Sequence, residues 1–292
     1  HCSPENQENF ENLYVSSYKK LSSFLYSHPK FMFSFYFSGL FFEWLQKKHE
    51  EFLTLLSELT NKKQIELFGG GYYDPLFPLI PPVDRIGQIE KLTTEIRKTT
   101  GKKPRGLKLV QSVWDSSIIS SLKSCGIEYV MLDSNLITQY STQNINFPFI
   151  VEDLGKTMTI LQQFKSNIPD SQLIPNDFIK KINLLSKNNL NSIVCITFEP
   201  SQIEYLLKNN WFEDFYNLSL DLDWLEISTP QIYLKNMSLR NRVNISPTAS
   251  SDLLSWAYNP YEKSKKLQKN ENIRSFFYTY PETYLLYTRM MY

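Results

Sequence analysis

The chain lacks several features that would fix its class at once. Its 292 residues include only 3 histidines and 3 cysteines, and its 31 Lys and Arg residues balance 30 Asp and Glu residues. This balance provides no global field that would attract nucleic acid or an anionic membrane surface. No apolar run reaches the roughly 20 residues that a membrane-spanning helix needs. We therefore expect neither nucleic acid nor a membrane as a partner.

The cysteines also exclude a common architecture. Cys2, Cys125 and Cys195 are widely spaced and form no CxxC pair, which argues against a disulfide framework or a zinc site. Reduced, buried thiols in a cytoplasmic protein fit this spacing better. Because the chain begins at His1 rather than at Met, its N-terminus is treated as incomplete, and a removed signal peptide stays open as an alternative.

The scarcity of histidine narrows the chemistry further. His28 precedes Pro29 in an expected turn, and His49 lies in the charged run KKHEE, so we predict that both are solvated. Metal-dependent hydrolysis and histidine general-base mechanisms are therefore disfavoured. The sequence also contains no Walker-type phosphate loop, no GxGxxG and no GxSxG elbow. No cofactor and no metal are expected.

What is present is an alternation of short strand-like runs with longer helical ones. Asp115 and Asn176 can cap two of the helices, and Gly126 can end one. Predicted strands cover residues 31–38, 64–68, 106–110, 127–132, 156–162, 192–198 and about 223–227. Predicted helices cover residues 40–59, 84–99, 116–124, 177–186 and about 202–209.

This order predicts an α/β fold whose parallel sheet has right-handed crossovers. Six or seven strand–helix units favour a closed or nearly closed, TIM-like barrel over a small open sheet. We place the barrel in residues 1–235. Residues 236–292, which end in an aromatic helical stretch, are predicted to form a C-terminal extension packed on the barrel.

Functional groups of parallel α/β folds gather where the strands end. The polar residues predicted at those points are Glu66, Asp74, Gln111, Trp114, Asp133 and Glu199. The aromatic side chains of Tyr72 and Tyr73 accompany them. Carboxylates beside aromatic rings suit a sugar, whose C–H face stacks while its hydroxyls form hydrogen bonds. The alternative is that Tyr72 and Tyr73 only cover the barrel and Asp74 caps a turn.

Several blocks of the sequence resemble glycoside hydrolase family 57, especially its 4-alpha-glucanotransferase and alpha-amylase-like branch. The most specific are QIELFGGGYYDP at 64–75 and GIEYVMLD at 126–133. Further similar blocks are FSGLFFEWL at 37–45, DRIGQIE at 84–90 and FFYTYPE at 276–282. The resemblance implies a (β/α)7 barrel followed by helices, and it implies retaining chemistry on α-1,4-glucans. It also places His1, Glu66, Tyr72, Trp114 and Asp133 in the substrate-binding cleft.

The departures from the family pattern fall on the chemistry. Active members carry Trp-Leu-Thr-Glu-Arg-Val-Trp in the third motif, and here Gln111 occupies the position of the nucleophilic Glu. For the general acid/base, Glu199 is only a loose positional candidate. Retaining hydrolysis needs two carboxyl groups about 5 Å apart, and a neutral amide is a poor nucleophile. The sequence therefore predicts a family member of carbohydrate metabolism with lost or strongly reduced glycosidase and transglycosylase activity.

Two other readings stay open. The first is an active α-glucan hydrolase or 4-alpha-glucanotransferase that uses relocated carboxylates, with Asp115, Asp133 and Glu199 as candidates. The second is a non-catalytic interaction module that no longer binds sugar. The expected ligand in the leading reading is an α-glucan or an oligosaccharide, and the sequence leaves the oligomeric state undefined.

Overall fold

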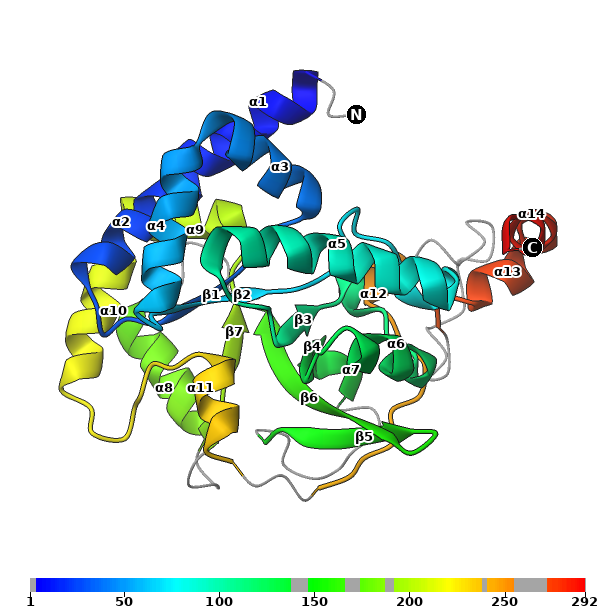
Figure 1. The fold of residues 1–292 in the computed structure, drawn as a ribbon. Coiled ribbons are helices and arrows are strands. Elements are labelled where there is room, and N and C mark those ends of the chain that lie inside the picture. Colours follow the sequence, from blue (N-terminus) through cyan, green and yellow to red (C-terminus); the bar gives the residue numbers. More distant parts are fainter. Residues whose placement is uncertain are drawn as a thin grey trace. The chain divides into compact units, whose positions relative to one another are not determined.

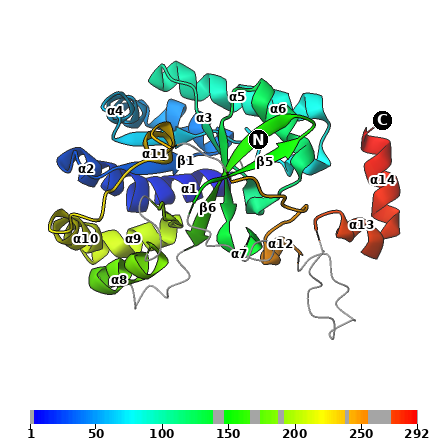
Figure 2. The same cartoon turned by 90° about the horizontal axis from the view of Figure 1, so that it is seen from below.

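The computed structural model describes residues 4–137, 147–165, 174–186, 192–237, 241–254 and 272–291 (Figures 1 and 2). The chain forms two compact units, each built from segments that are far apart in sequence. The first unit contains His1–Phe68, Thr93–Pro104 and Gln163–Ser238, and the second contains Gly69–Leu92, Arg105–Gln162 and Leu239–Tyr292. The units do not follow the division that we predict after residue 235, and that division stays a prediction.

The first unit opens with a helical segment that covers residues 4–27 and leads to the parallel strand pair β1 and β2. In this pair Ser34 lies opposite Glu66. The elements are α1 (Pro4–Leu13), a π-helical turn (Tyr14–Tyr18), α2 (Lys19–Ser27), β1 (Phe33–Tyr36), α3 (Gly39–Lys48), α4 (Glu50–Asn61) and β2 (Ile65–Phe68). Every residue of β2 is buried, as expected for a strand of a parallel sheet that is covered on both faces.

One predicted helix of this unit is two helices in the structure. The predicted helix at 40–59 breaks at His49, whose backbone (φ −141°, ψ 56°) is not helical. The prediction that His28 and His49 are solvated is wrong. Each side chain is only 17% exposed and has polar partners. Sequence alone placed His49 in a charged run, whereas α1 covers it with residues that are remote in sequence.

The remainder of the first unit continues the strand–helix alternation. Strand β7 (Cys195–Thr197) pairs in parallel with residues 163–165 of β6 (Lys156–Lys165). The helices are α8 (Pro175–Ser186), α9 (Pro200–Lys208), α10 (Trp211–Leu220) and α11 (Pro230–Lys235), and Figures 1 and 2 both show α8, α9 and α10 as neighbours. Two predictions are wrong here. Asn176 lies inside α8, which starts with Pro175, and residues 223–227 form turn and coil between α10 and α11.

The second unit contains the sheet order β3-β4-β6-β5. Strands β3 (Gly106–Lys108) and β4 (Tyr129–Asp133) pair in parallel, as predicted. Strand β5 (Phe149–Asp153) is an addition that the sequence analysis missed, and it pairs antiparallel with β6. The hairpin turn uses Leu154 and Gly155, both with positive φ (47° and 76°), which is the pattern of the two-residue turns that join antiparallel strands.

The core of the second unit combines strand residues, such as Leu107, Val130 and Ile160, with residues of α6, such as Leu122. Its helices are the second-unit part of α5 (Pro82–Thr100), α6 (Ile119–Ser124), α7 (Ser134–Ile137), α12 (Ser251–Leu254), α13 (Ser275–Thr279) and α14 (Pro281–Met291). Helix α14 has no fully buried residue, and the packing of the C-terminal helices on the barrel stays a prediction. Among the described residues, no helix has both the length and the apolarity to cross a membrane.

Candidate functional site

In the first unit, Glu66 is the buried carboxyl among the sequence-predicted residues. It lies on β2 with only 5% of its surface exposed. The backbone N–H of Gln231, in the first turn of α11, donates to Glu66 Oε2 at 3.1 Å. Burial raises the pKa of Glu66 to about 8, and the Gln231 hydrogen bond opposes this shift only in part. At neutral pH this carboxyl is therefore mainly protonated and can donate a hydrogen bond.

Cys195 lies within electrostatic reach of this carboxyl, and Tyr233 lies within electrostatic reach of Cys195. Burial, with an added effect of the Glu66 charge, raises the pKa of the Cys195 thiol to about 12. Burial also raises the pKa of Tyr233 to about 12, and Cys195 adds to it. Both groups stay protonated and unreactive at neutral pH. Among the described residues, Cys195 is a buried free thiol and Cys125 is a half-buried one.

Glu199, the candidate acid/base, has a local structural task. It is the N-cap of α9 and forms a capping box in which its side chain accepts from the N3 backbone. Its own backbone N–H donates to Gln202 Oε1 at 3.0 Å. The residue is exposed. Helix capping accounts for a carboxylate at this position without any catalytic role.

In the second unit, Gln111 follows β3 in a 3-10 turn (Val110–Ser112). Gln111 and Ser112 both have left-handed backbones, with φ of 50° and 49°, a conformation that is costly for residues other than glycine. Ser250 holds the turn twice. Its Oγ donates to Gln111 Oε1 at 2.7 Å, and its backbone N–H donates to the Gln111 carbonyl at 2.9 Å. The Gln111 residue is exposed on the surface of its unit.

Trp114 does not provide an open aromatic platform, contrary to what we predicted from the resemblance. It is 0% exposed and belongs to the hydrophobic core. Its backbone N–H and carbonyl both bond to Thr248, at 2.8 and 2.9 Å. The indole Nε1 is buried, and no described residue forms a hydrogen bond with it. Trp114 therefore anchors the turn at Gln111 to residues 248–250 rather than facing a ligand.

The two aspartates of this region serve the backbone. Asp133 ends β4, is 5% exposed, and accepts from the Asn135 backbone N–H at 3.1 Å. Asp115 caps the helix that follows it, as predicted, through Oδ1 and the Ser117 N–H at 3.0 Å. Its Oδ2 also lies 3.2 Å from an Arg274 nitrogen. Both oxygens of the Asp115 carboxylate therefore have partners, Oδ1 in the helix cap and Oδ2 in the ion pair with Arg274. These contacts compete with a catalytic role.

The two tyrosines of the loop GGGYYDP differ in exposure. Tyr72 is 5% exposed, and the ammonium of Lys91 lies 3.8 Å from its ring centroid. Tyr73 is 54% exposed, and Lys91 donates to its hydroxyl at 3.0 Å. Gln88 holds both backbones, because its carbonyl and its side-chain oxygen accept from the Tyr72 and Tyr73 N–H groups. Of the two rings, Tyr73 is the open one.

Sequence reasoning missed the residues that position this site. Gln88 and Lys91 are spaced three residues apart on one helix, so they share a face, and this was a usable signal for partners of the preceding loop. Nothing in the sequence marked Ser250 or Gln231, which approach their partners from segments more than 130 residues away. His1 lies outside the described residues. Among the described residues, no group of three His, Cys, Asp or Glu side chains could hold a metal ion.

Strands followed by helices, with parallel pairing of β1 with β2, β3 with β4 and β6 with β7, define an α/β fold. Comparison with solved structures shows the same fold. The 4-alpha-glucanotransferase from Thermococcus litoralis superposes with a TM-score of 0.81 at 23% identity, over 97% of this chain and 49% of that chain. An alpha-amylase from Thermotoga maritima superposes with a TM-score of 0.67 at 12% identity, over 88% of this chain and 75% of that chain. The predicted (β/α)7-barrel fold class is confirmed.

Residues 3–169 match the model of glycosyl hydrolase family 57, and the chain belongs to this family. Among curated proteins it is similar to alpha-amylase 1 of Dictyoglomus thermophilum, at 26% identity over 92% of this chain and 42% of that protein. It is also similar to the 4-alpha-glucanotransferase of Thermococcus litoralis, at 24% identity over 97% of this chain and 47% of that protein. The chain thus spans less than half the length of these relatives.

Proposed function

We propose that this protein binds an α-glucan or a related oligosaccharide and has lost the retaining hydrolysis and transfer chemistry of its family. The observation that carries the proposal is Gln111. It occupies the turn after β3, and its side-chain oxygen accepts a 2.7 Å hydrogen bond from Ser250. An amide has neither the charge nor the nucleophilicity that retaining glycoside hydrolysis needs from this group. Family membership supports the ligand class, because the relatives are named as an alpha-amylase and a 4-alpha-glucanotransferase.

The proposed binding residues differ in one respect from those that the resemblance implies. Tyr73 replaces Tyr72 and Trp114 as the aromatic platform, because its ring is 54% exposed and the other two are buried. Gln88 holds the Tyr73 backbone and Lys91 donates to the Tyr73 hydroxyl, so stacking costs little ordering of the side chain. Glu66 and Asp133 stay proposed polar contacts on the resemblance alone, because each is only 5% exposed.

An active enzyme with relocated groups is the second candidate, and one observation favours it. Glu66 is a carboxyl whose pKa is raised to about 8 by burial, which is the state of a general acid at neutral pH. Retaining chemistry also needs a second, ionised carboxylate, and two of the candidates for it have other partners. Glu199 caps α9, and Asp115 caps a helix and pairs with Arg274. We therefore place the binding protein first.

Titration calorimetry with maltoheptaose tests the proposal. The wild-type protein should release or take up heat on binding, and Tyr73→Ala should weaken the affinity by about fivefold or more through loss of the stacked ring. Tyr26→Ala is the matched control, because Tyr26 is 52% exposed and also has a lysine (Lys62) 4.9 Å from its ring centroid. Silent titrations with maltoheptaose and with a panel of other oligosaccharides would overturn the proposal in favour of the interaction module.

A further inference from the structure

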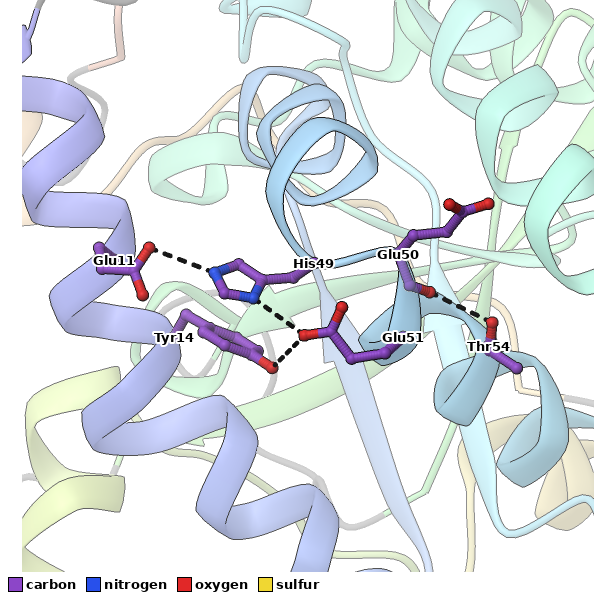
Figure 3. Close-up of polar contacts among 6 residues, drawn as sticks. All are labelled: Glu11, Tyr14, His49, Glu50, Glu51 and Thr54. Atoms are coloured by element: carbon purple, nitrogen blue, oxygen red, sulfur yellow. Dashed lines mark hydrogen bonds and ion pairs between the residues drawn. The ribbon is translucent and has the colours of Figure 1, made fainter.

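His49 lies between α3 and α4, and its two ring nitrogens contact carboxylates on α1 and α4 (Figure 3). Nε2 lies 3.2 Å from Glu11 Oε2 on α1, and Nδ1 lies 3.0 Å from Glu51 Oε1 in the first turn of α4. His49 itself forms the break between α3 and α4. Its side chain is 17% exposed, whereas those of Glu11 and Glu51 are 50% and 69% exposed. The imidazole is thus a largely enclosed link between two solvated carboxylates.

Aromatic rings enclose the imidazole on its remaining sides. The Tyr14 ring lies against it with a centroid distance of 3.9 Å, and the Trp44 ring is 5.0 Å away. The Tyr14 hydroxyl donates to Glu51 Oε1 at 3.4 Å (Figure 3). Burial, followed by the Glu51 charge, raises the pKa of Tyr14 to about 12, so the phenol keeps its proton. The hydrogen bond from His49 lowers the pKa of Glu51, which keeps that partner ionised.

The number of N–H groups on the His49 ring decides how the cluster of Glu11, His49 and Glu51 responds to pH. Ionised carboxylates only accept hydrogen bonds, and a neutral imidazole has one N–H and one lone pair. A neutral His49 can therefore serve one carboxylate, and its other nitrogen would face the second carboxylate lone pair to lone pair. The imidazolium donates to both at once and faces the electron-rich side of Tyr14. The arrangement in the structure is fully satisfied only by the charged ring.

His28 repeats this pattern at the other end of the same helical segment. Its Nδ1 lies 2.9 Å from the Phe24 carbonyl, one of the last acceptors of α2. Its Nε2 lies 3.2 Å from Glu213 Oε1 on α10. Tyr216, also on α10, is the other titratable group in contact, with a ring centroid 4.9 Å away. The Phe24 carbonyl also accepts from the His28 backbone N–H at 3.1 Å. A neutral ring has one N–H for its two acceptors, so both ring hydrogen bonds form only when the ring is protonated.

We propose that His49 and His28 form a pH-dependent fastening of the N-terminal helical segment, residues 4–27, to α4 and α10. Both links are complete when the imidazoles are protonated and the carboxylates are ionised. Each link loses one charge-assisted hydrogen bond when the imidazole gives up its second ring proton at higher pH. The segment is thus held more firmly at acidic than at alkaline pH.

Hydrogen exchange in the full chain tests the fastening. Protection factors for amides of α1, corrected for the intrinsic pH dependence of exchange, should fall by roughly two- to tenfold between pH 5.5 and pH 8.5, the loss of one hydrogen bond. Glu11→Gln should flatten this pH dependence, because an amide at position 11 can donate to the lone pair of a neutral His49. Glu8→Gln is the matched control, since it removes the same charge from an exposed position on the same helix.

Two results would overturn the proposal. One is a protection of α1 that stays constant from pH 5.5 to pH 8.5 in the wild-type protein. The other is an equal response of Glu8→Gln and Glu11→Gln, which would assign the effect to helix charge rather than to His49. Glu11 is half exposed, so neither variant threatens folding. The test uses no sugar, so its outcome is independent of the proposed glucan binding.

Discussion

Burial decides what each residue of the candidate site can do. Glu66 and Trp114 are both nearly inaccessible, with 5% and 0% exposure, yet the consequences differ. Burial keeps the carboxyl of Glu66 protonated and able to donate, whereas it removes the indole of Trp114 from any role as a stacking surface. Sequence position predicted both residues equally well, because it records which strand end a residue follows and not how deep its side chain lies.

The buried Glu66 predicts a specific pH dependence of stability. Its pKa is about 8 in the native state, against about 4.3 in an unfolded chain. Between these values the native state binds more protons, so the free energy of unfolding falls as pH rises, by at most about 1.4 kcal/mol per pH unit for this group. Glu66→Gln should abolish this slope, and urea unfolding at pH 5, 6.5 and 8 measures it.

An exposed carboxyl provides the control for that measurement. Glu199→Gln removes the same charge from an exposed residue of the same unit and should leave the slope of wild-type stability against pH unchanged. Parallel pH profiles of the wild-type protein and Glu66→Gln would show that Glu66 is ionised in the native state, contrary to our account.

At the scale of elements, helix α5 holds the loop 69–75 through hydrogen bonds to Gln88. The loop turns back sharply, so that a Cβ on Gly71 would lie 2.3 Å from Pro75 Cδ. Asp74 closes the turn with φ of 52° and a 3.3 Å hydrogen bond to the Gly71 carbonyl. Gln88 then fixes Tyr73 from α5. The open ring of Tyr73 therefore depends on a glycine two residues before it.

Alanine substitutions at two glycines test this dependence. Gly71→Ala should destabilise the protein by about 1–3 kcal/mol, since proline and backbone must move apart. It should also weaken glucan binding, as Tyr73→Ala is expected to do. Gly87→Ala is the matched control, because it lies within α5 and a Cβ there meets nothing within 4 Å. It should stabilise by roughly 0.5–1 kcal/mol. Thermal unfolding and calorimetry of both variants measure these effects, and a harmless Gly71→Ala would contradict the account.

Local signals predicted some elements and missed others for identifiable reasons. The capping role of Asp115 and the helix end at Gly126 (φ 80°) were predictable, because both depend on adjacent residues. The break at His49 was not, because Glu11 on α1 and Tyr14 in the π-helical turn help to hold it. The antiparallel strand β5 was missed although its sequence carries a local signal, a short strand-like run followed by Leu154 and Gly155 in the turn.

At the scale of the whole molecule, the family resemblance predicted the barrel, and the comparisons confirm it. The division of the chain was less accessible. Each compact unit combines segments from both halves of the sequence, and a boundary placed by composition cannot show such an exchange. The same limit applies to the candidate site, whose fixing residues Ser250 and Gln231 are distant in sequence from the residues that they hold.

The proposed loss of turnover at Gln111 is tested by analysis of reaction products. The purified protein and Gln111→Glu are each incubated with maltoheptaose, and the products are resolved by chromatography. We expect no released glucose and no rearranged maltooligosaccharides from either, since restoring one carboxylate leaves the acid/base position without its partner. Turnover by the wild-type protein at ordinary enzymatic rates, about 1 per second or faster, would contradict the account.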